Sequence, residues 1–221
     1  MPRSPQPASS HLPEAPGRPR IIGLIGGIAS GKSTVARLLA THGALVLDAD
    51  QSVHEILKRP EVISAIVQHF SSNVITPTGE VDRKELARRV FGASAEQTTD
   101  RHWLENLLHP LVRERTELQI READTRYPAI VIDAPLLLEA GWGHLCDAVL
   151  FVDTPWSIRC QLAGKRGWSQ SELEHREQAQ LPLADKRQQA SDIVVNDGTL
   201  ADLAMQVQDF WDKRVLAKPS A

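Results

Sequence analysis

Cysteine is scarce in this chain of 221 residues: only Cys146 and Cys160 occur, and they form no CxxC motif. A disulfide framework is therefore not expected, and both thiols are interpreted as buried structural residues. The sequence also has no apolar run near the roughly 18 residues of a membrane span. Its first twenty residues lack the apolar core of a signal peptide. These absences predict a cytoplasmic protein with no membrane partner.

Basic residues are not in excess either. Lys and Arg number 25 against 28 Asp and Glu, which gives a formal net charge of −3. General nucleic-acid binders normally carry a basic excess, so we expect no nucleic-acid partner. A local basic cluster remains compatible with a small phosphorylated ligand. The length fits one large domain, alone or with sizeable insertions, and we expect a monomer or a weak homo-oligomer.

Bulky apolar residues are nearly absent from residues 1–20, six of which are proline. Such a segment cannot bury enough surface to offset the entropy lost on ordering, so 1–20 is predicted to be a disordered tail. A targeting segment is the alternative interpretation. The remainder, 21–217, is interpreted as a single functional domain.

Five short apolar runs are rich in Val, Ile or Leu without alternation, as expected of parallel strands covered on both faces. Helical segments separate them, which predicts an α/β fold with a doubly wound, five-stranded parallel sheet. The interval between the second and third runs is about 80 residues, far more than one crossover helix needs, and predicts a helical subdomain. A charged stretch, Lys165–Arg187, predicts a mobile helical flap. The runs are Ile21–Ile25, Ala44–Leu47, Ala129–Ile132, Ala148–Val152 and Ile193–Val195.

Residues 26–33 read GGIASGKS and satisfy the pattern G-x-x-x-x-G-K-[ST] in full. The segment follows an apolar run and opens a helical pattern, so backbone N–H groups and the helix N-terminus converge where phosphate oxygens would lie. Lys32 can reach the outer phosphates, and Ser33 can offer its hydroxyl to Mg²⁺. An ordinary glycine-rich turn would leave the Lys-Ser pair unexplained. We therefore predict a nucleoside-triphosphate site.

The GTPase motifs N-K-x-D and D-x-x-G are both missing from the chain. The short chain, the helical insertion and the basic flap instead favour a kinase that acts on a small molecule. Such a kinase needs a closing lid, because water must be kept from the transferring phosphoryl group.

Asp48 and Asp50 end the second apolar run. If the chain stays extended here, both carboxylates lie on one face, because side chains of a strand alternate. They would project from the carboxyl end of the strand, where open α/β sheets place ligands. One carboxylate would accept the proton of an acceptor hydroxyl, and the other would order magnesium-bound water. The alternative is that Asp50 caps a helix beginning near Val53, although Ser52 with Glu55 already fits that cap.

Asp133 ends the third run and resembles the acidic residue that completes the magnesium shell in many phosphate-loop enzymes. A carboxylate in a strand-ending turn is the alternative interpretation. The segment Ala134–Glu139, APLLLE, combines an apolar step with one acid and is suited to lining a pocket; taken alone, it would be interpreted as core.

The segments GGIASGKST, LDAD, HPL, APLLLE and QLPLADKRQQASDIVVND resemble the dephospho-CoA kinase family in order and spacing over nearly all of residues 21–215. The phosphate loop is common to many families, whereas the other segments together are specific. That family transfers the γ-phosphoryl group of ATP to the ribose 3′-hydroxyl of dephospho-CoA, the last step of coenzyme A synthesis. The resemblance implies a P-loop kinase fold, with ATP and Mg²⁺ as cofactors and dephospho-CoA as substrate.

The resemblance also implies roles for individual residues. Asp50 would be the base or the hydroxyl-orienting group, and Arg159 and Arg166 would be catalytic residues of a lid at 159–187. A helical insert at 51–126 would bind CoA, and the remaining core would be 21–50, 127–158 and 188–217. The implied ATP-binding residues are Gly27, Ile28, Ala29, Ser30, Gly31, Lys32, Ser33, Thr34 and Asn196, the last near the adenine. The implied acceptor-binding residues are Asp48, Asp50, His109, Pro110, Leu136, Leu137 and Glu139.

The chain departs from the family pattern at two positions. Four residues before Arg166 the family carries an arginine and this chain has Leu162, so Arg159 or Lys165 would supply the charge. Asp133 is not fixed in the family, and its magnesium role rests on local context alone. Two other functions stay open: a nucleoside or nucleotide kinase, and a nucleotide-binding regulatory module that passes phosphate to no acceptor.

Overall fold

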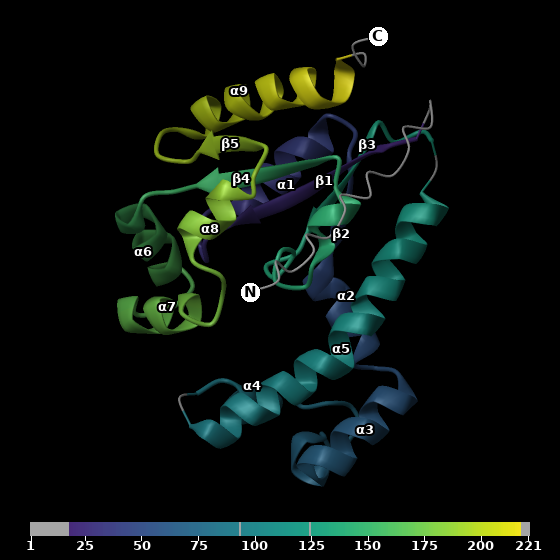
Figure 1. Cartoon of the computed structure of the whole chain (residues 1–221). Coiled ribbons are helices and arrows are strands. Elements are labelled where there is room, and N and C mark those ends of the chain that lie inside the picture. The colour runs from purple at the N-terminus through teal and green to yellow at the C-terminus, as the bar shows by residue number, and fades with distance from the viewer. Residues whose placement is uncertain (1–17, 93, 124, 218–221) are drawn as a thin grey trace, which may run out of the picture. The chain divides into compact units, whose positions relative to one another are not determined.

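The computed structural model describes residues 18–217, except for 93 and 124, and divides into two compact units. The first, here called the sheet unit, runs to Leu47 and resumes at Ala123. The second, called the helical unit, comprises Asp48–Glu122 and covers most of the insert expected at 51–126. Figure 1 gives the order of the elements along the chain.

The sheet unit is built on a five-stranded sheet with the strand order β2-β3-β1-β4-β5. β1 runs parallel to both β3 and β4, and β4 runs parallel to β5. All five expected strands are confirmed, as is the α/β fold class. The strands are β1 (Arg20–Gly26), β2 (Leu45–Asp48), β3 (Ala129–Asp133), β4 (Ala148–Asp153) and β5 (Asp192–Val195).

The expected tail at 1–20 extends too far along the chain. Arg20 is already the first residue of β1 and pairs with Ala129 of β3. Arg18 Nη2 lies 2.6 Å from Asp147 Oδ1, and the Ile21 N–H donates to Asp147 Oδ2 at 2.8 Å. These contacts fix residues 18–21 beside the start of β4. Residues 1–17 of the expected tail lie outside the described residues.

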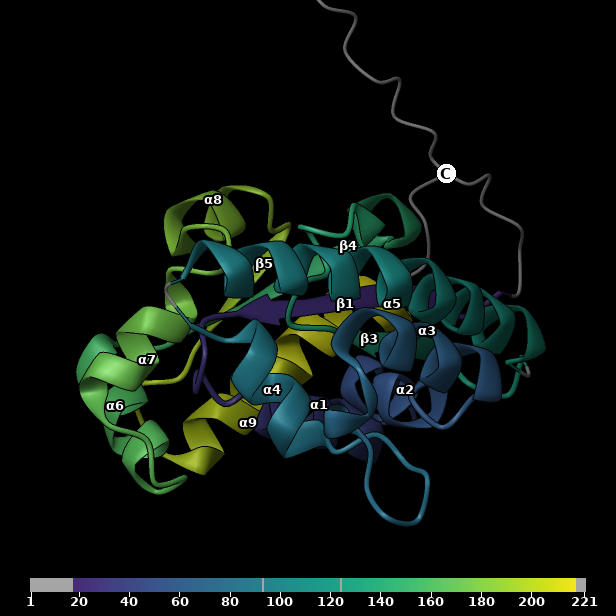
Figure 2. The ribbon, with the colours of Figure 1, turned by 90° about the horizontal axis from the view of Figure 1, so that it is seen from below.

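Helices cover both faces of the sheet. In Figure 2, α1 and α9 lie on one face and α8 on the other. On the first face, apolar side chains from α1, α9 and four strands form one core, with Leu24, Leu39, Leu150 and Val207 fully buried. The helices of this unit are α1 (Lys32–Thr41), α6 (Trp156–Gly164), α7 (Gln170–Glu177), α8 (Leu183–Gln188) and α9 (Leu200–Trp211), with short turns η2 (Trp142–Leu145) and η3 (Asp212–Leu216).

The helical unit is held together by its long last helix, α5, against which α2 and α4 pack. Ser94 and Gln97 exchange side-chain and backbone hydrogen bonds at the start of α5, which satisfies donors that the first turn would otherwise leave unpaired. The helix continues through His109 and Pro110 without interruption. The elements are α2 (Ala49–Ile56), α3 (Pro60–Phe70), η1 (Ser72–Val74), α4 (Arg83–Val90) and α5 (Ala95–Glu122).

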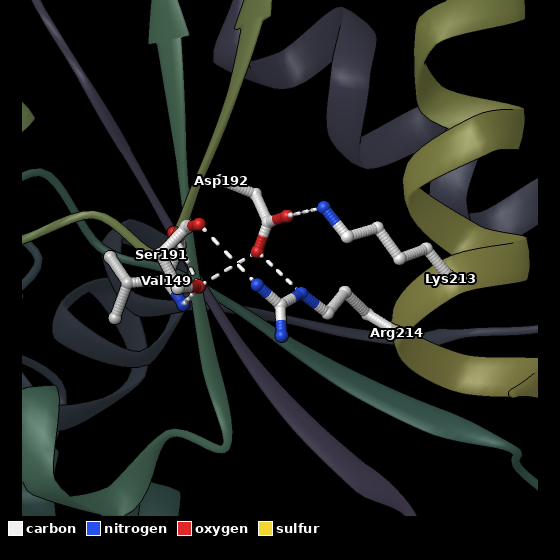
Figure 3. Close-up of polar contacts among 5 residues, drawn as sticks. All are labelled: Val149, Ser191, Asp192, Lys213 and Arg214. Atoms are coloured by element: carbon white, nitrogen blue, oxygen red, sulfur yellow. Dashed lines mark hydrogen bonds and ion pairs between the residues drawn. The ribbon is translucent and has the colours of Figure 1, made fainter. Parts of the chain in front are cut away.

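The carboxyl-terminal segment is tied to β5 through Asp192, as Figure 3 shows. Arg214 Nε donates to Asp192 Oδ2 at 2.7 Å, and Lys213 Nζ lies 3.5 Å from Asp192 Oδ1. The Ser191 hydroxyl donates to Asp192 Oδ2 at 2.9 Å and accepts from the Val149 N–H at 3.0 Å. The start of β5, the start of β4 and the end of the described chain therefore share one polar cluster.

β5 lies last in the strand order, and α9 supplies one of its partners. Gln206 Oε1 accepts from the Val195 N–H, and Gln206 Nε2 donates to the Val195 carbonyl, both at 2.8 Å. A side-chain amide thus makes the pair of hydrogen bonds that a neighbouring strand would make. Across the described stretches, no helix combines the length and apolar character needed to cross a membrane.

Candidate active site

The predicted phosphate loop connects the carboxyl end of β1 to the amino end of α1. Gly31 is the N-cap residue of α1 with φ 89°, and Ala29 also has a positive φ, 58°. A Cβ on Gly31 would lie 2.6 Å from Asn196 Nδ2, so only glycine fits both the backbone conformation and the space. The loop closes on itself through the Ser30 N–H, which donates to the Gly27 carbonyl at 3.2 Å.

Lys32 and Ser33 begin α1 directly behind the loop. Lys32 Nζ donates to the carbonyls of Gly26 at 3.2 Å and Gly27 at 3.0 Å, so the ammonium group lies over the loop itself. Ser33 is exposed in the first helical turn, with Thr34 next to it. A cation, a hydroxyl and a helix N-terminus therefore meet at one point, an arrangement suited to binding phosphate and a divalent cation.

Two other strand ends hold the loop in place. The Ser30 carbonyl accepts from Thr154 Oγ1 at 2.7 Å and from Asn196 Nδ2 at 2.9 Å. The Asn196 N–H in turn donates to the Asp153 carbonyl at 2.7 Å. Asn196, which the resemblance implies as an ATP-binding residue, therefore lies beside the loop. Thr154 was not among the predicted site residues; its place directly after β4 is the signal that could have found it.

Arg159 projects from α6 to the loop. Its side chain is only 6% exposed and forms an ion pair with Glu177, the last residue of α7. A Cβ on Gly27 would lie 2.8 Å from Arg159 Nη1 and 3.2 Å from Glu177 Oε1, so both groups lie against the loop. The guanidinium carbon is 4.9 Å from the centroid of the Trp156 ring, a cation–π contact that holds it. Glu177 carried no signal in the sequence, because 18 residues separate it from Arg159.

The other basic candidates of the lid segment lie at the surface. Lys165 and Arg166 are exposed just after α6, and the Arg166 guanidinium is 5.9 Å from the ring centroid of Trp168. Arg176 of α7 approaches that ring more closely, at 4.3 Å. Of Arg159, Lys165 and Arg166, Arg159 is the one that lies at the phosphate loop.

The segment after β3 is bound to α8 and to the residues just before it through a buried lysine. Lys186 of α8 is 1% exposed, and its Nζ lies 2.9 Å from Glu139 Oε1. The same ammonium donates to Gln180 Oε1 at 2.9 Å and to the Pro135 carbonyl at 3.2 Å. Glu139 Oε1 also accepts from the Leu181 N–H at 3.0 Å. Glu139 therefore joins two segments that lie 42 residues apart in the chain.

The apolar acceptor residues after β3 differ in burial. Leu137 is fully buried, and a Cβ on Gly23 would lie 3.0 Å from its Cδ1, so Leu137 packs on the sheet as a core residue. Leu136 is half-buried. The interpretation of this segment as core thus fits Leu137, and of the two leucines Leu136 is the more accessible.

Asp133 ends β3 beside Leu24 of β1, at the carboxyl edge of the sheet. Its carboxylate and the Ser33 hydroxyl are the hard oxygen donors that Mg²⁺ prefers, and a nucleotide-bound Mg²⁺ needs only one or two protein ligands. Throughout 18–217, apart from 93 and 124, no three His, Cys, Asp or Glu side chains gather into a metal cage. The donor set therefore fits a magnesium ion carried by phosphates.

Asp48 and Asp50 do not share a strand face, which corrects the expectation of an extended DAD segment. Asp48 is the N-cap residue of α2, and its Oδ1 accepts from the N–H groups of Asp50 at 2.8 Å and Gln51 at 3.1 Å. Asp50 is exposed in the first turn of that helix. The expected cap at Ser52 is also wrong, because Ser52 lies inside α2 and donates to the Asp48 carbonyl at 3.2 Å. Asp48 takes the cap because its side chain, on an extended backbone, accepts from two N–H groups of the first helical turn at once.

Comparison with known proteins places these features in one family. A family model described as dephospho-CoA kinase matches residues 20–202. The dephospho-CoA kinase of Parasynechococcus marenigrum (strain WH8102) is 40% identical over 189 residues, which cover 85% of this chain and 93% of that protein. That of Synechococcus sp. (strain CC9605) is 44% identical over 191 residues, with 83% and 89% covered. The crystal structure of TT1252 from Thermus thermophilus has a TM-score of 0.74 at 33% identity and covers 92% of this chain and 100% of its own. The chain therefore belongs to the dephospho-CoA kinase family.

Proposed function

We propose that this chain transfers the γ-phosphoryl group of ATP to the ribose 3′-hydroxyl of dephospho-CoA, giving CoA and ADP. The observation that carries the proposal is the complete phosphate loop, on which Asn196 and Arg159 converge, in a chain of this family. The 3′-oxygen bonds to the γ-phosphorus as the bond to the β–γ bridging oxygen breaks, and ADP leaves with the electron pair. Positioning and charge neutralisation are what such a reaction requires of the protein.

The donor side is assigned to the sheet unit. Backbone N–H groups of residues 27–34 bind the phosphates, and Lys32 exchanges its loop carbonyls for the outer phosphate oxygens. Arg159 neutralises charge that develops on the γ-phosphoryl group, a role supported by its place against Gly27. Arg166 is a second, exposed candidate for this role. Asn196 borders the loop, and the resemblance to the family assigns it to the adenine side of the site.

Ser33 and Asp133 are the residues that would hold magnesium. When bound, the ion would neutralise negative charge on the phosphate oxygens and orient them. The support for this assignment is the chemistry of the two side chains and their positions in the fold. Asp133 is the last residue of β3, and Ser33 is the second residue of α1, after the loop that follows β1.

The acceptor side is assigned residue by residue, from the resemblance to the family. Asp50 takes the proton of the 3′-hydroxyl or orients that hydroxyl, and Asp48 supports it by capping the helix that carries it. The resemblance also assigns His109, Pro110, Leu136 and Glu139 to dephospho-CoA. Leu137 is fully buried and contributes by packing on the sheet. Residues 159–187 are assigned as the lid that excludes water.

The test is ADP release from ATP and Mg²⁺ with and without dephospho-CoA, followed by mass analysis of the acceptor. We expect acceptor-dependent ADP release, the gain of one phosphate on dephospho-CoA, and loss of both in Lys32→Ala. Nucleosides and nucleoside monophosphates serve as control acceptors. ADP release that ignores dephospho-CoA, or a preference for the control acceptors, would remove the substrate assignment and leave only the nucleotide site.

A further inference from the structure

We infer that Glu177 is an internal anion that competes with the phosphates of ATP for Arg159, and that it thereby lowers the affinity of the chain for ATP. The inference rests on the proposed function, because it takes the phosphate loop to be the ATP site. It assigns to α7 an affinity-setting role that none of the sequence motifs indicates.

The position of the carboxylate is the first support. Glu177 Oε1 would lie 3.2 Å from a Cβ on Gly27, close to the 2.8 Å of Arg159 Nη1. A glutamate that only supported the arginine would lie on the side of the guanidinium away from the loop. Glu177 instead places negative charge beside the backbone to which phosphate oxygens bind.

The second support is the incomplete pairing of Arg159. Its Nη1 donates to Glu177, whereas its Nε is buried and has no hydrogen-bond partner within the part of the chain that the structure describes. The side chain is held over Trp156 and is only 6% exposed, so little water can satisfy its remaining donors. A guanidinium has donors for two acceptors in a fixed fork, so it remains able to bind a phosphate oxygen.

The sign of the effect follows from two arguments that agree. Phosphates entering beside Gly27 are repelled by the Glu177 carboxylate, and they must also share or take over its arginine. Neutralising Glu177 removes the repulsion and leaves Arg159 as a buried charge without a counterion, a costly arrangement that a bound phosphate relieves. Both effects make ATP bind more tightly to a Glu177→Gln protein.

The chain provides a matched control on the same helix. Glu174 lies one turn earlier in α7, is exposed, and accepts from Gln170 Nε2 at 3.0 Å. Glu174→Gln therefore makes the same change of charge on α7 without touching the pair at the loop. Glu177→Asp is the second control, because it keeps the negative charge and shortens the side chain.

The experiment is equilibrium binding of ATP with Mg²⁺ to the full chain by calorimetry. We expect Glu177→Gln to lower the Kd by roughly fivefold or more, the lower end of ordinary coupling between sites. Glu174→Gln should leave it within about twofold, and Glu177→Asp should stay nearer the wild type than Glu177→Gln. In an Arg159→Met background, Glu177→Gln should change the Kd by a smaller factor, because there is no longer an arginine to compete for. The double-mutant cycle measures this difference. In steady-state kinetics, the KM for ATP should fall without a rise in kcat.

Each contrary result has its own meaning. An unchanged or higher Kd for ATP in Glu177→Gln overturns the inference, while the proposed function stands. A fall of the Kd in Glu177→Asp or Glu174→Gln that equals the fall in Glu177→Gln overturns it as well. If Glu177→Gln does not fold, a Kd for Glu177→Ala equal to or above that of the wild type overturns it in the same way. A wild-type chain that binds no ATP would instead remove the proposed function itself.

Discussion

Replacing Lys186 by methionine should destabilise the sheet unit strongly, because it removes one partner of a buried ion pair. The methionine keeps most of the aliphatic volume but removes the ammonium group that meets Glu139, Gln180 and the Pro135 carbonyl. The Glu139 carboxylate then stays in place without its cation, and its Oε2 already has no hydrogen-bond partner among the described residues.

The magnitude follows from burial. Removing one partner of a buried ion pair costs about 3–5 kcal/mol, and the lower end applies because the Glu139 side chain is 19% exposed. We therefore expect Lys186→Met to lower the free energy of unfolding by about 3 kcal/mol. For a chain of this length that corresponds to a Tm lower by about 6–12 °C.

Urea unfolding followed by circular dichroism measures the change as a lower midpoint at unchanged m. Lys165→Met is the matched control, since Lys165 is exposed and should change stability by no more than about 0.5 kcal/mol. Adding Glu139→Gln to Lys186→Met should recover at least about 1 kcal/mol, because the unbalanced charge is gone. A loss below about 1 kcal/mol in Lys186→Met would refute the reasoning that this ion pair is desolvated.

Three further predictions concern the site and its surroundings. Asp50→Ala should lower kcat by about 10²–10⁴, the usual span for loss of a general base, and a variant that keeps most of its kcat would remove Asp50 from the mechanism. Asn196→Ala should cost about 0.5–1.5 kcal/mol of unfolding free energy and weaken ATP binding, since Ser30 keeps only its bond from Thr154; calorimetry and urea titration check both effects. Burial, and next the charge of Asp147, raise the pKa of the Cys146 thiol to about 12, so maleimide at pH 8 should label Cys146 only after unfolding. Cys146 is half-buried, so the raised pKa is what should protect it, and rapid labelling of the native chain that is lost in Cys146→Ala would contradict the raised pKa.

Much of the sheet unit was predictable because its determinants are local. Continuous apolar runs identify parallel strands, and GGIASGKS carries its own backbone requirements in the order of its residues. The start of α2 was not predictable in the same way. Asp48 and Ser52 are both good cap residues, and only the turn of the chain after β2 decides that Asp48 takes the cap and Asp50 joins the helix.

Contacts between distant residues account for what the sequence missed at the site. Glu177 reaches the loop only because α7 packs on α6, and Lys186 meets Glu139 only because α8 lies against the segment after β3. In the linear sequence, both residues look like ordinary charges of a solvated helix. Burial, which is a property of the packed chain, turns them into strong electrostatic partners.

The hydrogen bonds between Gln206 and Val195 should reduce aggregation of the protein at high concentration. An open sheet edge with exposed Ile193 and Val195 would invite a strand from another molecule to add to it. The amide of Gln206 already saturates the backbone of Val195, so an incoming strand would have to displace it before it could pair there. Gln206 of α9 thus opposes the addition of a strand from another molecule to β5. It does so at Val195, directly before Asn196.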